Sequence, residues 1–374
     1  MKYPGILILS VFFLILLPGN SPGEESVWWE LVEQANRNGD YGSALDYLSR
    51  MEMKDPHTRE LARVKVSLLN RLGNKYYRER DIPRARDTFL EALYIDPANF
   101  VTLRMLGEIA YFTQNLEEAG RYWEEALSLQ PDDSTLKTLL NKLKKEKKVE
   151  GGMDSSSLAN FDIRYHGGDP NYNIYDIQGN LLEAYQEIGY DFNYYPTSSI
   201  VVLLYTKDEF SRLRNTPNWV GALYDGKIRL PIPGDELDAA EIKNILWHEY
   251  THSLINDETG NNCPRWLHEG LAQYQQAKII PVDQRVLDYA LRDDRLIPLA
   301  RLDRAFGFNQ SRDKVRLAYA QAYSLTSYLI ERYGFWRINV ILQSLKKGRG
   351  WKQVFEEELL LPVRELENEW REAI

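Results

Sequence analysis

Cysteine is almost absent from this 374-residue chain, which contains it only at position 263. A single cysteine cannot form an intramolecular disulfide, so the folded state has to be stabilised by its hydrophobic core. Cys263 precedes Pro264 in a polar segment, and we expect it to be a small packed thiol rather than a redox group or a metal ligand. Histidine is also rare, with five residues in total.

An excess of positive charge is missing as well. The net charge is −9 and the isoelectric point is near 5.3, which argues against nucleic acid as a partner. The length allows two or three domains, each with its own core.

Long hydrophobic runs are missing beyond the N-terminus. Residues 6–17 form an apolar run that would span roughly 18 Å as a helix, short of the ~30 Å hydrocarbon core of a bilayer. Lys2 precedes this run, and Pro18 and Gly19 follow it. The pattern predicts a secretory signal peptide over residues 1–23, and hence export to the periplasm or out of the cell. An uncleaved N-terminal membrane anchor is the alternative.

The first half of the chain contains an internal repeat of 34 residues. Six pairs of identical or similar residues have this separation: Leu72 and Leu106, Gly73 and Gly107, Ala85 and Ala119, Phe89 and Trp123, Ala92 and Ala126, Pro97 and Pro131. The pattern resembles the tetratricopeptide repeat, in which small residues lie where two helices touch and a proline follows the second helix. We expect Gly73 to allow a close helix approach and Phe89 to fill the space between the helices.

The repeat pattern extends on both sides of these two copies. A degenerate copy, NRNGDYGSALDYLSRM, precedes them, and a basic amphipathic segment at 137–148 is suited to a terminal capping helix. Residues 25–149 are therefore predicted to be an all-α, tetratricopeptide-like domain. Its surface either binds a peptide or partner protein, or only positions the second half of the chain. The polar, glycine- and serine-rich residues 150–157 are predicted to be a linker.

The second half has the pattern of an α+β domain. Two apolar segments, at 161–166 and 198–206, are typical of strands, and the residues between them have helical spacing. The segment GALYDGKIRLPIPG predicts a β-hairpin with a turn at Asp225-Gly226. Pro231 and Pro233 suit only an edge strand. The residues after about 265 are predicted to be mainly helical.

The motif His248-Glu249-x-x-His252 is the strongest chemical signal in the sequence. On a helix the two histidines lie one turn apart on one face, and Glu249 lies about 100° around, within reach of a metal-bound water. A catalytic zinc site needs three protein ligands and one open position. The third ligand is either Glu269 or His268, which are adjacent and point in different directions on a helix. We favour Glu269, because a carboxylate inside the apolar segment WLHEGLA needs a cation.

The combination of His-Glu-x-x-His with Trp-x-x-Glu-Gly-x-Ala resembles the gluzincin metallopeptidases, and more narrowly the bacterial domains called peptidase MA-like. The resemblance implies that Glu269 is the third zinc ligand and that residues 158–374 form an α+β zincin-type peptidase domain with a helical C-terminal subdomain. A metzincin would need Gly and His where this chain has Ile255 and Glu258.

The resemblance also implies a mechanism. Zn²⁺ would activate a water molecule, with Glu249 as the general base. A tyrosine of a later helix would stabilise the oxyanion, and Tyr323 is preferred to Tyr319, although both could instead only pack in a helical core. Residues 221–233 would pair with an extended peptide or protein substrate. The prediction is thus an exported zinc metallopeptidase, and the alternative is a noncatalytic adaptor with a structural or degenerate zinc domain.

Overall fold

The computed structural model of this chain describes residues 24–52, 59–79, 81–167, 173–213, 223–224, 226–232, 238–307 and 310–374. The predicted signal peptide at 1–23 lies outside the described residues. Among the helices that are described, none combines the length and the apolar character needed to cross a bilayer.

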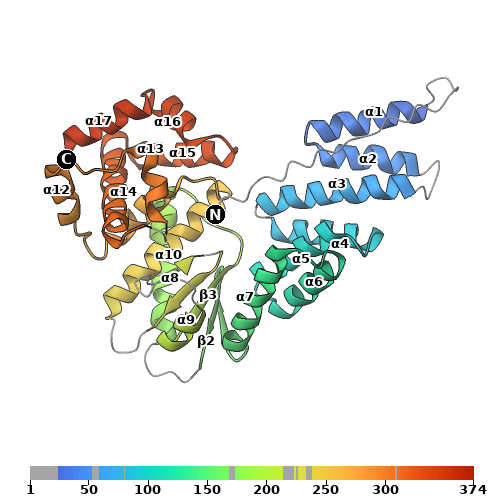
Figure 1. Ribbon diagram of the computed structural model, residues 1–374, viewed down its shortest axis with the longest axis horizontal. Coiled ribbons are helices and arrows are strands. Elements are labelled where there is room, and N and C mark those ends of the chain that lie inside the picture. The colour runs from blue at the N-terminus through green and yellow to red at the C-terminus, as the bar shows by residue number, and fades with distance from the viewer. Residues whose placement is uncertain are drawn as a thin grey trace.

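The N-terminal part consists of stacked antiparallel helices (Figure 1). They are α1 (Glu24–Arg37), α2 (Tyr41–Glu52), α3 (Arg59–Arg78), α4 (Ile82–Ile95), α5 (Phe100–Phe112), α6 (Leu116–Leu129) and α7 (Ser134–Glu150). Four successive helices begin at an Asp or Asn side chain that accepts a hydrogen bond from a backbone N–H in the first turn; these N-caps are Asp81, Asn99, Asn115 and Asp133. Local sequence therefore determines where each helix of the array starts.

Two glycines set the distance between the paired helices of each repeat. A Cβ atom at Gly73 would lie 2.9 Å from the Phe89 ring, and one at Gly107 would overlap the Trp123 ring. Both rings are buried, with 0% and 1% of their surface exposed. The close approach expected from the sequence is confirmed in both copies, and the larger indole takes the position of the phenyl ring without a change of architecture.

The second part is built on a five-stranded sheet. Its elements are β1 (Asp154–Leu158), β2 (Phe161–Tyr165), α8 (Ile174–Phe192), β3 (Ile200–Tyr205), α9 (Lys207–Leu213), β4 (Leu223–Tyr224) and β5 (Ile228–Pro231). The strand order is β1-β2-β3-β5-β4, with β2, β3 and β5 parallel and both outer pairs antiparallel. Half of the predicted linker at 150–157, namely residues 154–157, is therefore strand, and Glu150 is the last residue of α7. Serine-rich sequence hid this strand, because an exposed edge position does not require apolar residues.

The antiparallel pairing of β4 with β5 confirms the predicted hairpin, although Asp225 of its turn lies outside the described residues. The strand order corrects the prediction about the prolines. β5 is an interior strand, and of this pair β4 forms the edge. Pro231 is tolerated because the N–H of its neighbour Ile232 donates to the Tyr205 carbonyl oxygen at 2.7 Å, so the proline nitrogen faces away from β3. The pairs between β4 and β5 end at Arg229, before they would reach the proline. Pro233 lies outside the described residues.

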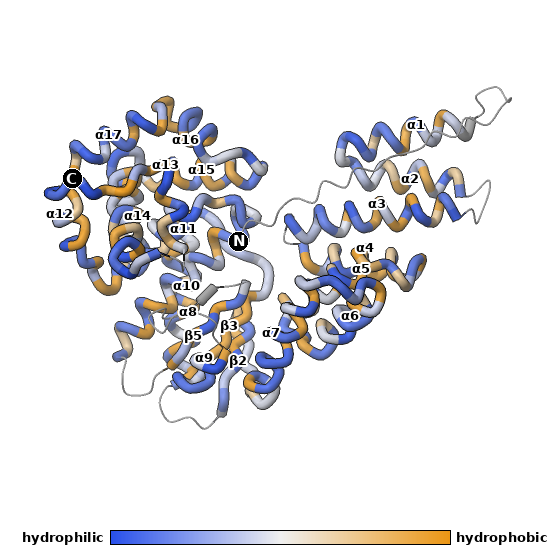
Figure 2. Tube along the Cα trace, viewed as in Figure 1, coloured by the Kyte–Doolittle hydropathy of each residue, from blue (hydrophilic) through white to orange (hydrophobic). Residues whose placement is uncertain are grey.

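The sheet has helices on both faces. One face, which carries Val202 and Leu204, packs on α8 and α10 (Ala239–Thr259); we call it the inner face. The other, outer face carries Val201 and Leu203 and packs against residues of α7 and α9. All six residues of β3 are buried, as expected for a strand covered on both sides, and they form a hydrophobic stretch in Figure 2.

The rest of the chain is helical, as predicted. It contains α11 (Arg265–Gln276), α12 (Arg285–Arg292), α13 (Leu299–Leu302), the short 3-10 helix η2 (Asp303–Phe306), α14 (Arg312–Tyr333), α15 (Phe335–Lys346), α16 (Trp351–Leu359) and α17 (Val363–Ala373). One continuous core joins these helices to α10 and the inner face of the sheet. The sheet and the C-terminal helices therefore form a single domain.

The helical repeats are fastened to the outer face by a buried cluster of charged groups. Arg229 of β5 lies 3.0 Å from Glu146 and 2.8 Å from Glu150, both on α7. The Tyr111 hydroxyl donates to Glu146 at 2.9 Å, and the Tyr205 hydroxyl donates to Glu150 at 2.6 Å. We call these five residues the Arg229 cluster. Burial raises the pKa of Glu146. For Glu150 the charge of Arg229 and the Tyr205 hydrogen bond together outweigh burial, and the pKa is lowered.

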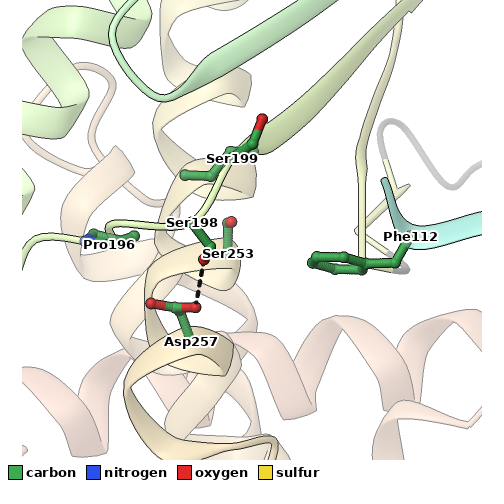
Figure 3. A pocket seen from close by; sticks show the side chains of 8 residues that line it. Phe112, Pro196, Ser198, Ser199, Ser253 and Asp257 are labelled. Carbon is green, nitrogen blue, oxygen red and sulfur yellow. Dashed lines mark hydrogen bonds between the residues drawn. The ribbon is translucent and has the colours of Figure 1, made fainter. Parts of the chain in front are cut away.

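A second contact of the repeats lies beside a small cavity at the start of β3 (Figure 3). Phe112, at the end of α5, lines it together with Ser198, Gly226 and two residues of α10, Ser253 and Asp257. The Ser198 hydroxyl donates to Asp257 at 3.0 Å. Phe112 of the second repeat thus lies against Gly226 between β4 and β5, and α10 lines the same cavity.

Candidate metal centre

The helix that carries the histidine motif is defined at both ends by its sequence. Asp238 accepts a hydrogen bond from the backbone N–H of Glu241, whose side chain accepts one from the backbone N–H of Asp238, which is a capping box. Gly260 ends α10 in the left-handed conformation, with φ of 60°. The residues between are buried on several sides, so the motif lies inside the domain.

A second helix brings the third predicted ligand to the same place. Asp303 of η2 accepts a hydrogen bond from the backbone N–H of Trp266 at 3.0 Å and so caps the start of α11. A Cβ atom at Gly270 would overlap Thr326 Oγ1 and the carbonyl oxygen of Ala322, both on α14. The glycine therefore permits a close crossing of α11 and α14 and fixes the position of its neighbour Glu269.

Three ligand atoms converge in the space between α10 and α11. Nε2 of His252 lies 3.0 Å from Nε2 of His248 and 3.3 Å from Oε2 of Glu269, and the third side of the triangle, from His248 to Glu269, is 3.8 Å. A tetrahedral zinc ion about 2.1 Å from each atom would separate its ligands by about 3.4 Å. Within the described part of the chain, these three residues form the group that could hold a metal ion.

The protonation of these groups also fits a cation. Burial lowers the pKa of His248 to about 4 and that of His252 to about 3, so both imidazoles are neutral at neutral pH. The Gln276 amide oxygen lies 2.5 Å from Nδ1 of His248, which places the proton there and leaves Nε2 free to coordinate. Oε2 of Glu269 is buried and has no hydrogen-bond donor among the described residues. A metal ion would satisfy it.

His268, the other candidate for the third ligand, lies outside the three converging residues. Its ring stacks parallel on the His252 ring, with centroids 4.4 Å apart and an angle of 5° between the planes. Burial lowers its pKa well below the ordinary range. It is not a member of the converging group, which contains Glu269 instead.

Glu249 is buried next to the converging group, with 6% of its surface exposed. Burial, followed by the negative charge of Glu269, raises the pKa of Glu249 to about 8. A cation at the converging atoms would oppose both effects and favour the carboxylate form. The position is that of a proton acceptor for a water molecule on such a cation.

Of the two candidate tyrosines on α14, Tyr319 is the one beside this group. Burial raises its pKa, with smaller contributions from the nearby charges of Glu269, Arg265 and Glu249. The pKa of Tyr274, in contrast, is raised by burial and by nearby groups that include Tyr323. The choice between Tyr319 and Tyr323, the residue that the sequence favours, therefore belongs to the proposed mechanism. The two tyrosines are one helical turn apart, and spacing alone does not distinguish them.

Arg265 is a polar residue of this site that the sequence analysis missed. Its Nε atom lies 3.6 Å from Oε1 of Glu269. The signal that could have revealed it is its position four residues before Glu269 on the same helix, where side chains of opposite charge face each other.

Because burial raises the pKa of two carboxyl groups, Glu249 and Glu258, to about 8, we expect the metal-free protein to lose stability as the pH rises from about 6.5 to 8. In this window the unfolded chain has released the protons of Glu249 and Glu258 and the folded chain retains them, so a rise in pH favours unfolding. The slope is at most about 1.4 kcal/mol per pH unit for each group.

Urea denaturation in the presence of a chelator measures this slope. Glu258→Gln should reduce it by about half, because one of the two groups no longer titrates. A stability that is constant over this pH range would contradict the assignment of buried, protonated carboxyl groups.

Replacing Gly270 by alanine should lower the free energy of unfolding by roughly 1–3 kcal/mol, because the added methyl group meets backbone of α14 that cannot move aside. The matched control is Gly179→Ala. Gly179 lies on α8 and has no atom within 4 Å of its Cβ position, so alanine should stabilise the helix by up to about 1 kcal/mol. Chemical denaturation measures the free energy of unfolding of both variants. A change of the same sign in both would refute the close crossing of α11 and α14.

Two comparisons with known proteins bear on this site. Residues 216–374 match a family model described as Peptidase MA superfamily. A stretch of 130 residues is 27% identical to the DnaJ homolog subfamily C member 7 homolog of Schizosaccharomyces pombe, which covers 34% of this chain and 27% of that protein. The chain therefore spans about a quarter of the length of that relative. All three converging residues and Glu249 lie inside the first match, and the chain thus contains a Peptidase MA superfamily domain at residues 216–374.

Proposed function

We propose that this protein is an exported zinc-dependent peptidase that hydrolyses peptide bonds with Glu249 as the general base. The convergence of His248, His252 and Glu269, with a fourth, carboxylic group buried beside them, is the observation that carries the proposal. The match to the Peptidase MA superfamily supports it. The donor set of two imidazoles and one carboxylate is also one that zinc accepts in hydrolytic sites.

A zinc ion held by these three residues would supply Lewis-acid activation of the attacking water and of the scissile carbonyl group. The side chains of the protein perform the proton transfers. Glu249 accepts a proton from the water and returns it to the nitrogen of the leaving amine. The Tyr319 hydroxyl donates a hydrogen bond to the carbonyl oxygen as negative charge develops on it.

Peptides or proteins are the proposed substrates. β4 lies at the edge of the sheet, and α10 contacts this strand. An extended peptide could therefore add to the edge close to the metal ligands, and its main chain would supply most of the affinity. The helical repeats are proposed to bind a partner protein, a role supported by their tetratricopeptide-like packing.

Metal analysis and peptide digestion test the proposal. The purified full-length chain should contain about one zinc ion. His248→Ala or Glu269→Ala should remove it, while His268→Ala should retain it. The zinc-loaded chain should cleave members of an unbiased peptide library, lose this activity to a chelator and regain it with zinc. A chain that binds zinc and cleaves nothing would favour the alternative, a noncatalytic adaptor with a structural zinc domain.

A further inference from the structure

Arg265 occupies a position that a cation does not favour. It is the first residue of α11, where the positive end of the helix dipole repels positive charge. Its contacts are directed to the metal centre: Nε faces Oε1 of Glu269, the carboxylate oxygen that does not face the histidines. This arrangement leaves Oε2 for a metal ion and places a guanidinium group at the rim of the same site.

Phe306 of η2 holds Arg265 and Tyr319 together. The Arg265 guanidinium lies over the Phe306 ring, 5.4 Å from its centroid. The Tyr319 ring packs against the same phenyl ring edge to face, with centroids 5.1 Å apart and an angle of 87°. Phe306 is 3% exposed, so both polar groups rest on one rigid support. The charge of Arg265 also acts on the Tyr319 phenol, whose pKa it lowers against the larger effect of burial.

The guanidinium group keeps donors for a ligand. The Arg265 side chain is 45% exposed, whereas that of Glu269 is 10% exposed. Arginine has five N–H donors and no acceptor. The guanidinium can therefore only donate, and it cannot accept the proton of the Tyr319 O–H.

We propose that Arg265 and Tyr319 form an anion-binding pair beside the metal position, and that Arg265 is a second stabiliser of the oxyanion formed during peptide hydrolysis. The catalytic half of this inference rests on the proposed function. Two preorganised donors on one side of the reacting carbonyl oxygen would share its developing charge. Because Arg265 is half exposed, its removal should reduce kcat roughly 10- to 100-fold, at or below the range for a fully enclosed donor.

Anion binding is measured independently of catalysis. The full-length protein is loaded with Co²⁺ and titrated with inorganic phosphate, and the visible absorption of the cobalt reports binding. Arg265→Gln should weaken phosphate binding about tenfold or more, and Arg265→Lys should be intermediate, because it keeps the charge and loses the planar donor fork. Arg285→Gln is the control, since Arg285 forms an exposed ion pair with Asp283. All variants should retain about one cobalt ion per chain.

The kinetic test compares Arg265→Gln, Tyr319→Phe and the double variant in the zinc-loaded enzyme. If both residues act on one oxyanion, the effect of the double variant on kcat should be smaller than the product of the single effects. Wild-type phosphate affinity and wild-type kcat in Arg265→Gln would overturn the inference. If that variant does not fold, unchanged phosphate affinity in Arg265→Lys would overturn it. If wild type cleaves no peptide but phosphate binding still depends on Arg265, the proposed function fails and the anion-binding pair stands.

Discussion

Replacing Glu249 by glutamine is expected to reduce kcat by roughly 10²- to 10⁴-fold while zinc stays bound, because a general base of this kind contributes that much. Glutamine has the same shape but cannot accept the proton of the attacking water at neutral pH. The three converging ligand atoms come from other residues, so the metal content should stay at about one ion per chain. Steady-state kinetics on a peptide cleaved by wild type, together with metal analysis, provide the measurement.

The matched control for this variant is Glu258→Gln. Glu258 lies on the same helix and is 2% exposed, and its pKa is raised by burial in the same way, but it is outside the converging group. It should therefore keep its kcat. Equal activity of wild type and Glu249→Gln would exclude this glutamate as the base, whereas equal losses in both variants would point to disturbance of the helix.

Replacing Arg229 by alanine is expected to lower the free energy of unfolding by about 3–5 kcal/mol, the cost of leaving a buried charge without its partner. Arg229, Glu146 and Glu150 are all less than a tenth exposed, and the one guanidinium contacts both carboxyl groups. Urea denaturation of the full-length chain measures the loss. The cluster joins the repeats to the sheet, so both parts should unfold at a lower urea concentration.

Two further variants separate charge from packing. Arg229→Met combined with Glu146→Leu and Glu150→Leu should cost less than Arg229→Ala alone, since the guanidinium and the two carboxyl groups that contact it are then removed together. Arg295→Ala removes an arginine from an exposed ion pair with Asp293 and should change stability little. A small effect of Arg229→Ala would mean that water reaches the cluster or that the repeats separate from the sheet.

The convergence of the three candidate ligands could be predicted from sequence because much of their geometry is local. The i, i+4 spacing of His248 and His252 places both rings on one helix face whatever surrounds that helix. Glu269 follows after a short loop. The contact between Gly73 and Phe89 could also be predicted, since each unit of a 34-residue repeat packs its two helices in the same way.

The features that sequence could not provide depend on contacts between distant segments. Arg229 meets Glu150 across 79 positions of the chain and Tyr111 across 118, and no periodicity reports such a pair. The choice of Tyr319 over Tyr323 depends on the rotation of α14 against α11. The strand β1 was missed because its residues are polar, and its partner β2 supplies the apolar side of the pair.

The last helix of the repeat array, α7, is at the same time a cover for the outer face of the sheet. A fragment that begins at residue 158 would expose Arg229 and the apolar side chains of β3 to water, and we expect it to aggregate rather than to work as a separate enzyme. A protein bound to the repeats would consequently be presented to the candidate metal centre in one defined orientation. Which bond is cut would then depend on how far the bound protein extends as well as on its residues.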